Sequence, residues 1–96
     1  MTTLHLVRRS WYSQQDHQPL TALLSGDDAI MLLDDGVYNI GHPELIKLIE
    51  HVSTVYVIEH HFKARGLDNT NNAIQTVSMK TLIELSLQFD KTLTWQ

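Results

Sequence analysis

The residues best suited to chemistry in this chain are two adjacent carboxylates, Asp34 and Asp35, which directly follow an apolar segment. Paired acids at the end of a buried strand can bind a metal ion or accept a phosphoryl group. A turn explains the same residues, because aspartate forms local hydrogen bonds to the backbone and Gly36 permits a positive φ. We favour the turn, because the chain does not supply both a matching acid pair and a lysine at suitable strand ends.

The histidines form a second group that could do chemistry, as metal ligands. His60 and His61 are adjacent in sequence, and His51 lies nine residues before His60. Adjacent helical residues point about 100° apart, whereas zinc-binding helices place two histidines four residues apart on one face. We therefore expect polar surface residues, although His61, near a strand end, could titrate around neutral pH. We expect His5, inside a strand, to be a hydrogen-bonded core or interface residue.

Nucleophilic and cofactor chemistry have little support. Ser10 follows two arginines and lies in no Gly-x-Ser-x-Gly elbow, and the four glycines are dispersed and form no phosphate loop. Cysteine is absent, which excludes a disulfide framework, a thiolate metal site and a cysteine nucleophile in this chain. We therefore expect no catalytic, cofactor-binding or metal-binding residues, and any sulfur chemistry would need a thiol on another protein.

The composition is that of one small acidic domain, residues 1–96. Its hydrophobic content of 43% supports a core, but a chain of 96 residues buries only roughly 60 to 65% of its unfolded surface, so a partner could add stability. The net charge of −4, with scattered basic residues, argues against a nucleic-acid surface. Because no signal peptide and no membrane-length apolar run is present, we expect a soluble, cytoplasmic protein.

The segment before the two acids, residues 29–33, must position them. Its residue pattern predicts a buried strand. Its apolar residues lack helical periodicity and lie between acidic, glycine-marked turns, as in strands covered on both faces of a parallel sheet. Sites in such sheets gather at the carboxyl ends of strands, so residues 34–38 are the first place to expect function. Further strands are predicted at residues 3–7, 54–58 and 73–77, and residues 92–95 form a terminal strand or a tail.

Helical spacing of apolar residues predicts the connections. A short helix with Pro19 near its start would contain Leu20, Leu23 and Leu24, and a longer helix would span residues 44–52. Gly66 would close a helix over residues 59–65, and Ser78 would cap one from residue 79 to about 89. Alternating strands and helices predict an α/β fold with a mostly parallel sheet and right-handed crossovers. The expected apolar faces are Leu45, Ile46, Leu48, Ile49 and Val52 in the second of these helices, and Met79, Leu82, Ile83, Leu85 and Phe89 in the last.

Aromatic residues on connecting segments and near the C-terminus suggest a different role. Trp11, Tyr12, Phe62 and Trp95 could each plug the core or anchor an interface, and the sequence leaves both open. A small acidic domain with such residues suits protein binding.

Several segments, read together, resemble the TusB/DsrH family over nearly the whole chain and in the right order. They are residues 4–10, the strand and turn at 26–38, and the segment 55–67. The most specific pieces are Asp35-Gly36-Val37-Tyr38, the helix end Ala64-Arg65-Gly66-Leu67, and Trp95 near the end of the chain.

The resemblance implies a three-layer α/β/α domain with a mostly parallel four- to five-stranded sheet, as in the DsrE, DsrF and DsrH proteins. It further implies a subunit of the TusBCD sulfur-relay complex, a dimer of heterotrimers with TusC-like and TusD-like sister subunits. That complex accepts persulfide sulfur from TusA and passes it, with TusE, toward 2-thiolation of the wobble uridine in tRNA. In such complexes the sulfur-carrying cysteine belongs to TusD.

The absence of cysteine agrees with that division of roles and departs from DsrH members of sulfur-oxidising organisms, which typically carry a cysteine after the first strand. Here residues 10–24 contain no thiol, which favours the tRNA-thiolation branch. The expected contribution is structural or allosteric, with no activity of the chain alone, no cofactor and no direct contact with nucleic acid or membrane. The candidate interface and strand-end residues are Ser10, Trp11, Tyr12, Asp35, Gly36, Tyr38, Phe62, Arg65 and Trp95.

Two other functions remain open from the sequence. One is a stand-alone α/β domain that binds a small molecule or metal through Asp34, Asp35 and His61. The other is a homo-oligomeric interaction module, since the fold of this family pairs readily with its own kind and an isolated chain could self-associate.

Overall fold

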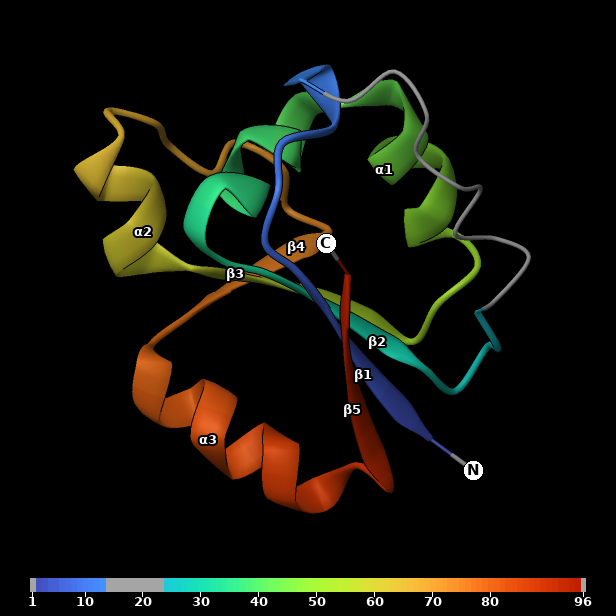
Figure 1. The fold of residues 1–96 in the computed structure, drawn as a ribbon. Coiled ribbons are helices and arrows are strands. Elements are labelled where there is room, and N and C mark those ends of the chain that lie inside the picture. The colour runs from blue at the N-terminus through green and yellow to red at the C-terminus, as the bar shows by residue number, and fades with distance from the viewer. Residues whose placement is uncertain (1, 14–23, 96) are drawn as a thin grey trace.

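The strands form one five-stranded sheet in which every neighbouring pair is parallel, in the order β4-β3-β2-β1-β5 (Figure 1). This computed structural model describes residues 2–13 and 24–95. The mostly parallel α/β sheet predicted from the sequence is therefore confirmed. The strands are β1 (Thr3–Val7), β2 (Ala29–Leu32), β3 (Thr54–Ile58), β4 (Ile74–Val77) and β5 (Lys91–Trp95).

Helical segments cover both faces of the sheet and complete the three layers (Figure 1). Among the described residues, one face carries η3, α1 and α2, and the other carries α3. Of the short helix predicted near Leu20, Leu23 and Leu24, only Leu24 lies among the described residues, and it packs against the core. The described helices are the 3-10 segments η1 (Trp11–Ser13) and η3 (Asp34–Gly41), and the α-helices α1 (Pro43–Ile49), α2 (Glu59–Ala64) and α3 (Met79–Gln88).

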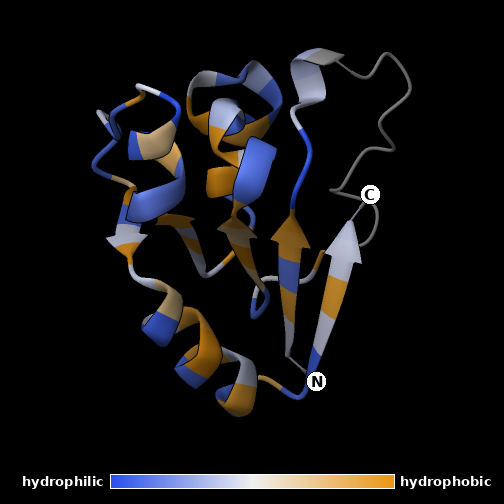
Figure 2. Cartoon of the chain, turned by 60° about the vertical axis from the view of Figure 1, so that its left-hand side comes forward, coloured by the Kyte–Doolittle hydropathy of each residue, from blue (hydrophilic) through white to orange (hydrophobic). Residues whose placement is uncertain are grey.

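The core has two halves because strand side chains alternate between the faces of the sheet. On β1, Leu4 packs into the half under α3 and Val7 into the half under η3 and α1. All four residues of β2 are buried, as expected for the most central strand, and Figure 2 shows hydrophobic colour along the middle strands. The sequence-based prediction of a strand covered on both faces is confirmed.

Helix ends follow the predicted local chemistry. Ser78 Oγ accepts a hydrogen bond from the Thr81 N–H, and Gly66 after α2 adopts a left-handed φ of 69°. His42 supplies an N-cap that the sequence reasoning missed, because its Nδ1 accepts from the Glu44 N–H at 3.1 Å.

Three predictions about elements need correction or completion. The turn expected after β2 is the eight-residue 3-10 helix η3, and α1 ends at Ile49, three residues earlier than expected. The segment left open as strand or tail is the strand β5, paired with β1. Not every predicted apolar helix position packs inward, either on α1 or on α3. The exposed ones are Ile46, Met79 and Ile83.

Candidate functional site

The candidate site is the carboxyl edge, which we define as the residues that follow β1, β2 and β3: Arg8 to Ser10, the start of η3, and α2. The backbone there is tightly packed. Leu33 N–H donates to Val7 O at 3.1 Å, and a Cβ built on Gly36 would lie 1.9 Å from the same oxygen. Glycine is therefore required at position 36 because β1 approaches closely. The predicted reason was wrong, since the positive φ belongs to Asp34, at 51°, and not to Gly36.

Arginine side chains form ion pairs with both adjacent acids, Asp34 and Asp35. Arg8 Nε donates to Asp34 Oδ2 at 2.8 Å, and Arg65 Nε donates to Asp35 Oδ1 at 3.0 Å. Arg65 also donates through Nη1 to the carbonyl oxygen of His61 at 3.0 Å, which ties the end of α2 to η3. Among the described residues, no group of three potential ligands is arranged to hold a metal ion. The acids orient guanidinium groups at this edge.

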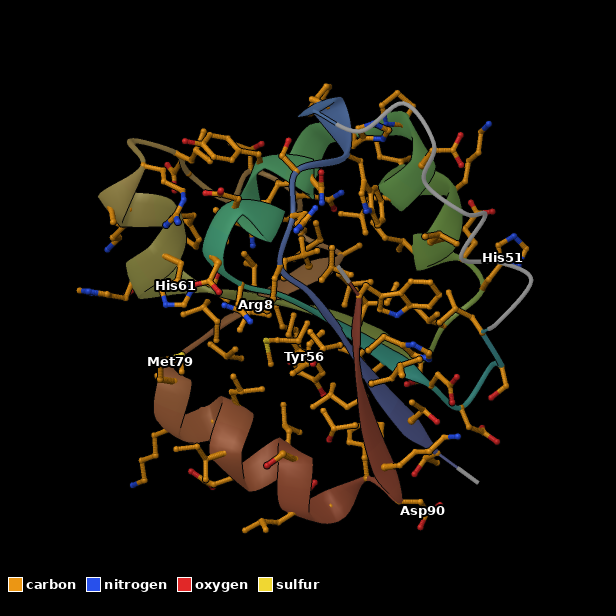
Figure 3. The ribbon with its side chains drawn as sticks, viewed as in Figure 1. Arg8, His51, Tyr56, His61, Met79 and Asp90 are labelled. Atoms are coloured by element: carbon orange, nitrogen blue, oxygen red, sulfur yellow. The ribbon has the colours of Figure 1, made fainter. Side chains whose placement is uncertain are left out.

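His61 belongs to the same cluster. Its Nδ1 accepts a hydrogen bond from the Asp34 N–H at 2.8 Å, so the neutral imidazole carries its proton on Nε2. Asp34 Oδ1 lies 3.8 Å from that unprotonated nitrogen, which is not an ion pair in this state. The side chain is only 19% exposed, so the prediction of a surface histidine was wrong for His61, although His60 and His51 are exposed. Figure 3 shows His61 and Arg8 at the same edge of the sheet, where they follow β3 and β1, with β2 between these two strands.

The loop after β1 is held by Asn39, a fully buried residue that the sequence reasoning missed. Its Oδ1 accepts from the Trp11 backbone N–H at 2.8 Å, and its Nδ2 donates to Arg9 O at 2.9 Å. Nothing local in the sequence marks this asparagine, because its partners lie about 30 residues away. Ser10 Oγ accepts from the Tyr12 N–H at 3.3 Å, a local contact within the same loop.

The predicted aromatic residues divide into three groups, of which the first lies in the core and the second at the surface. Trp11 and Phe62 are buried in the core half under η3 and α1. Tyr12 is 64% exposed and Tyr38 is 40% exposed, so these two present aromatic surface at the same end of the molecule as the carboxyl edge. The structure therefore places Trp11 and Phe62 in the core, and an interface role of the exposed Tyr12 and Tyr38 stays a prediction.

Trp95 belongs to a third group, the His5 network, which consists of Trp95, His5 and Asp28. Trp95 Nε1–H donates to His5 Nδ1 at 2.9 Å, and His5 Nε2–H donates to Asp28 Oδ2 at 2.9 Å. Asp28 also accepts from the Thr3 N–H at 3.0 Å and from the backbone N–H and side-chain hydroxyl of Ser25. The expectation that His5 is a hydrogen-bonded core residue is confirmed, since it is 2% exposed.

Opposing effects act on the pKa of Asp28. Burial raises it, whereas the hydrogen bonds from His5, Ser25 and Thr3 lower it, and the net result is a pKa below the ordinary value. The carboxylate is thus charged and buried, and it accepts hydrogen bonds from His5, Ser25 and Thr3. The sequence reasoning placed Asp28 in a turn and missed this role, although Ser25 three residues earlier is a local signal for such a side-chain bond.

The predicted site residues are therefore only partly brought together. Asp35, Gly36 and Arg65 meet at the carboxyl edge, with Ser10 and Tyr12 in the loop after β1. Trp95 instead forms a hydrogen bond with His5, and Trp11 and Phe62 lie in the core.

An all-parallel α/β domain with charged side chains at the carboxyl ends of its central strands defines the class of this protein. The solution NMR structure of protein Tm0979 from Thermotoga maritima has the same fold, with a TM-score of 0.62 and 22% identity over 90% of this chain and 92% of that one. The sequence model of the family described as DsrH like protein matches residues 9–92. The chain therefore belongs to the DsrH-like family.

Membership of this family supports a role related to sulfur relay in general. No curated protein sequence matches the chain closely enough to suggest a particular relative. None of the helices in the described residues has the length and apolar character that a membrane span needs.

Proposed function

We propose that this chain is a non-catalytic subunit of a sulfur-relay complex that supports 2-thiolation of the wobble uridine in tRNA. The observation that carries the proposal is the DsrH-like match over residues 9–92 in a chain without cysteine. A thiolate is the nucleophile and the carrier in persulfide transfer, and neither serine nor histidine replaces it in that role. The transferred sulfur would then reside on a TusD-like sister subunit, and this chain would supply the surface that binds its sister subunits.

Exposed apolar side chains support association with such partners. Met79, Ile83 and Leu87 are 43%, 60% and 82% exposed, and their spacing of four residues puts them along one side of α3. Tyr12 and Tyr38 add aromatic surface near the carboxyl edge. Aromatic side chains, methionine and contiguous apolar surface are typical of protein interfaces. We expect TusC-like and TusD-like subunits in a heterohexamer in the cytoplasm, with TusA and TusE reached through that complex.

The test is a tagged pull-down from the native cell, with mass spectrometry and native mass of the recovered assembly. Two sister subunits in equal amounts, near six chains in total, are expected. Deletion of the coding sequence should also lower the 2-thiouridine content of digested tRNA, and expression of the full chain should restore it.

A matched pair of variants tests the surface. Ile83→Glu combined with Leu87→Glu should lower partner recovery, whereas Lys80→Gln on the same helix should not, and all three side chains are exposed, so the fold should persist. Recovery of the chain alone, with unchanged 2-thiouridine in the deletion strain, would contradict the proposal.

The edge strand β5 favours a second candidate, a homo-oligomeric interaction domain. Four of its five residues are exposed, and an open strand edge can pair with the same edge of another copy. The mass of the purified chain in solution tests this candidate, which requires a dimer or larger assembly at micromolar concentration without any other protein, so a monomer would contradict it.

A further inference from the structure

All three arginines of this acidic chain line one pocket. The pocket has a volume of about 370 Å³ at the carboxyl edge and is lined by Arg8, Arg9, Asp34, Asp35 and Arg65. Arg8 and Arg9 follow β1, whereas Arg65 ends α2 more than fifty residues later, so the tertiary structure brings them together. The four lysines of the chain do not line this pocket. The net charge of the chain is −4, so this pocket concentrates positive charge in a protein that is negative as a whole.

The charges in this arginine pocket do not cancel. Three guanidinium groups face two carboxylates, which leaves one net positive charge when His61 is neutral. In the part of the chain that the structure describes, Arg8 pairs with Asp34 and Arg65 with Asp35, and no carboxylate forms an ion pair with Arg9. The pocket therefore favours a negatively charged ligand.

The donors in the pocket also exceed what the described residues use. Each guanidinium has five N–H groups. Hydrogen bonds to other described residues use one of them on Arg8 and two on Arg65, and both ion pairs go through Nε. With Nε held by a carboxylate, the side chain is oriented and terminal N–H groups remain for a planar fork of hydrogen bonds, the geometry with which arginine binds oxyanions.

We propose that the arginine pocket binds a small tetrahedral oxyanion of the sulfate, thiosulfate or phosphate type. Its place at the carboxyl ends of β1, β2 and β3 is where ligands bind in open parallel sheets. A divalent cation is disfavoured by the excess of guanidinium groups, and an extended nucleic acid is disfavoured by the net negative charge of the chain. The inference concerns a ligand of this chain itself and does not depend on the relay function proposed above.

The test is an NMR titration of the isotope-labelled full chain with sodium sulfate, thiosulfate and phosphate at constant ionic strength, with chloride as the reference. We expect saturable shifts of the arginine Nε–H signals and of the amides at residues 8, 9, 35 and 65. Arg9→Gln should weaken binding about tenfold, equivalent to about 1.4 kcal/mol, because it removes a full set of donors. Lys80→Gln, which removes the same charge from exposed α3, should leave the affinity unchanged.

The three anions distinguish the source of the ligand. Tighter binding of sulfate and thiosulfate would assign a sulfur oxyanion, and tighter binding of phosphate would assign a phosphoryl group. Shifts that do not saturate, or equal affinities of Arg9→Gln and Lys80→Gln, would overturn the proposal. Because Arg9 is exposed, the variant should keep a native amide spectrum, which is checked in the same experiment. The pull-down result is independent of this outcome.

Discussion

Two groups of charged and polar side chains in this protein use similar chemistry in opposite surroundings. In the His5 network, Asp28 and His5 are both buried and each hydrogen bond has a defined partner. In the arginine pocket, the side chains of Arg8 and Asp34 are 52% and 39% exposed. A buried group that loses its partner costs the full desolvation penalty, whereas water replaces a partner lost at the surface. The first group should therefore determine stability, and the second is available to a ligand.

The carboxyl edge itself combines both situations, because its backbone is packed while its side chains are exposed. Gly36→Ala should produce the largest loss, about 3 kcal/mol of unfolding free energy, since the new Cβ meets the Val7 carbonyl and the backbone must shift. Gly41→Ala is the matched control, because an added Cβ there meets nothing within 4 Å. Urea denaturation measures both. Equal unfolding free energies of the two variants would show that the backbone of the carboxyl edge is loosely packed. The contrast between its packed backbone and its exposed side chains would then be wrong.

The buried carboxylate should be next in importance. Asp28→Asn should cost about 2 kcal/mol, because an amide donor then faces the donating His5 Nε2–H in a buried place. The neighbouring exposed Asp27→Asn should change stability by less than about 0.5 kcal/mol. Because both variants replace aspartate with asparagine, the difference between their unfolding free energies in urea measures the effect of burial. A loss at Asp27 as large as that at Asp28 would count against the network.

The other end of the network should contribute less, because Trp95 lies on an edge strand and is only partly buried. Trp95→Phe should cost about 1 kcal/mol by removing the donor to His5 Nδ1. Nitrogen NMR of the imidazole supplies a second readout, since the Nδ1 signal should shift when its hydrogen bond is lost. An unchanged signal would show that this hydrogen bond is absent in solution.

The pH dependence gives a smaller effect of definite sign. The folded pKa of Asp28 is below its ordinary 3.8, so its contribution to stability is complete above pH 3.8 and is lost as the pH falls through the folded pKa. Asp90 contributes in the same direction, because the Thr2 N–H lowers its pKa. Asp28→Asn should therefore flatten, without abolishing, the fall in melting temperature below pH 3.8. A variant with the same acid profile as the unmodified protein would contradict this assignment.

The exposed ion pairs should have the smallest effect on stability and the clearest effect on binding. Arg65→Gln should cost no more than about 0.5 kcal/mol, similar to Lys63→Gln, which breaks the exposed pair with Glu59 on α2. The two variants should differ in oxyanion affinity, which only Arg65→Gln should lower. Thermal melting measures the contribution of Arg65 to stability, and the NMR titration measures its contribution to oxyanion binding. A large loss of stability in Arg65→Gln would assign that arginine to the structural group.

Local patterns predicted most elements of the fold correctly. The β-branched run of β3, the apolar run of β2, the Ser78 cap and the Gly66 helix end all depend on residues close in sequence, so their physical causes are visible there. The residue boundaries were less accurate where a helix meets a turn, as at the end of α1. The 3-10 form of η3 was missed because its packing against the end of β1 is a tertiary contact.

The candidate site was predicted in part, for the same reason. Its position at the carboxyl end of β2 follows from the architecture of parallel sheets, and Asp35, Gly36 and Arg65 were named from motifs. Asn39 and Asp28 were missed, and His61 was placed at the surface. Apart from Ser25, which is close to Asp28 in sequence, their partners lie between 23 and 30 residues away. Helical and strand periodicity describes neighbours within one element and does not predict such pairs.

By itself, the sequence determined the α/β class, the order of elements, the family and the absence of a thiol in this chain. Each of these depends on residue type or on spacing within one element. Only the tertiary structure decided that Trp95 bonds to His5 in the interior, that Gly36 is needed for space, and that three arginines share one pocket. The physical reason is that desolvation, close contact and charge neutralisation depend on which atoms are neighbours in space, and in a parallel sheet those neighbours come from distant parts of the chain.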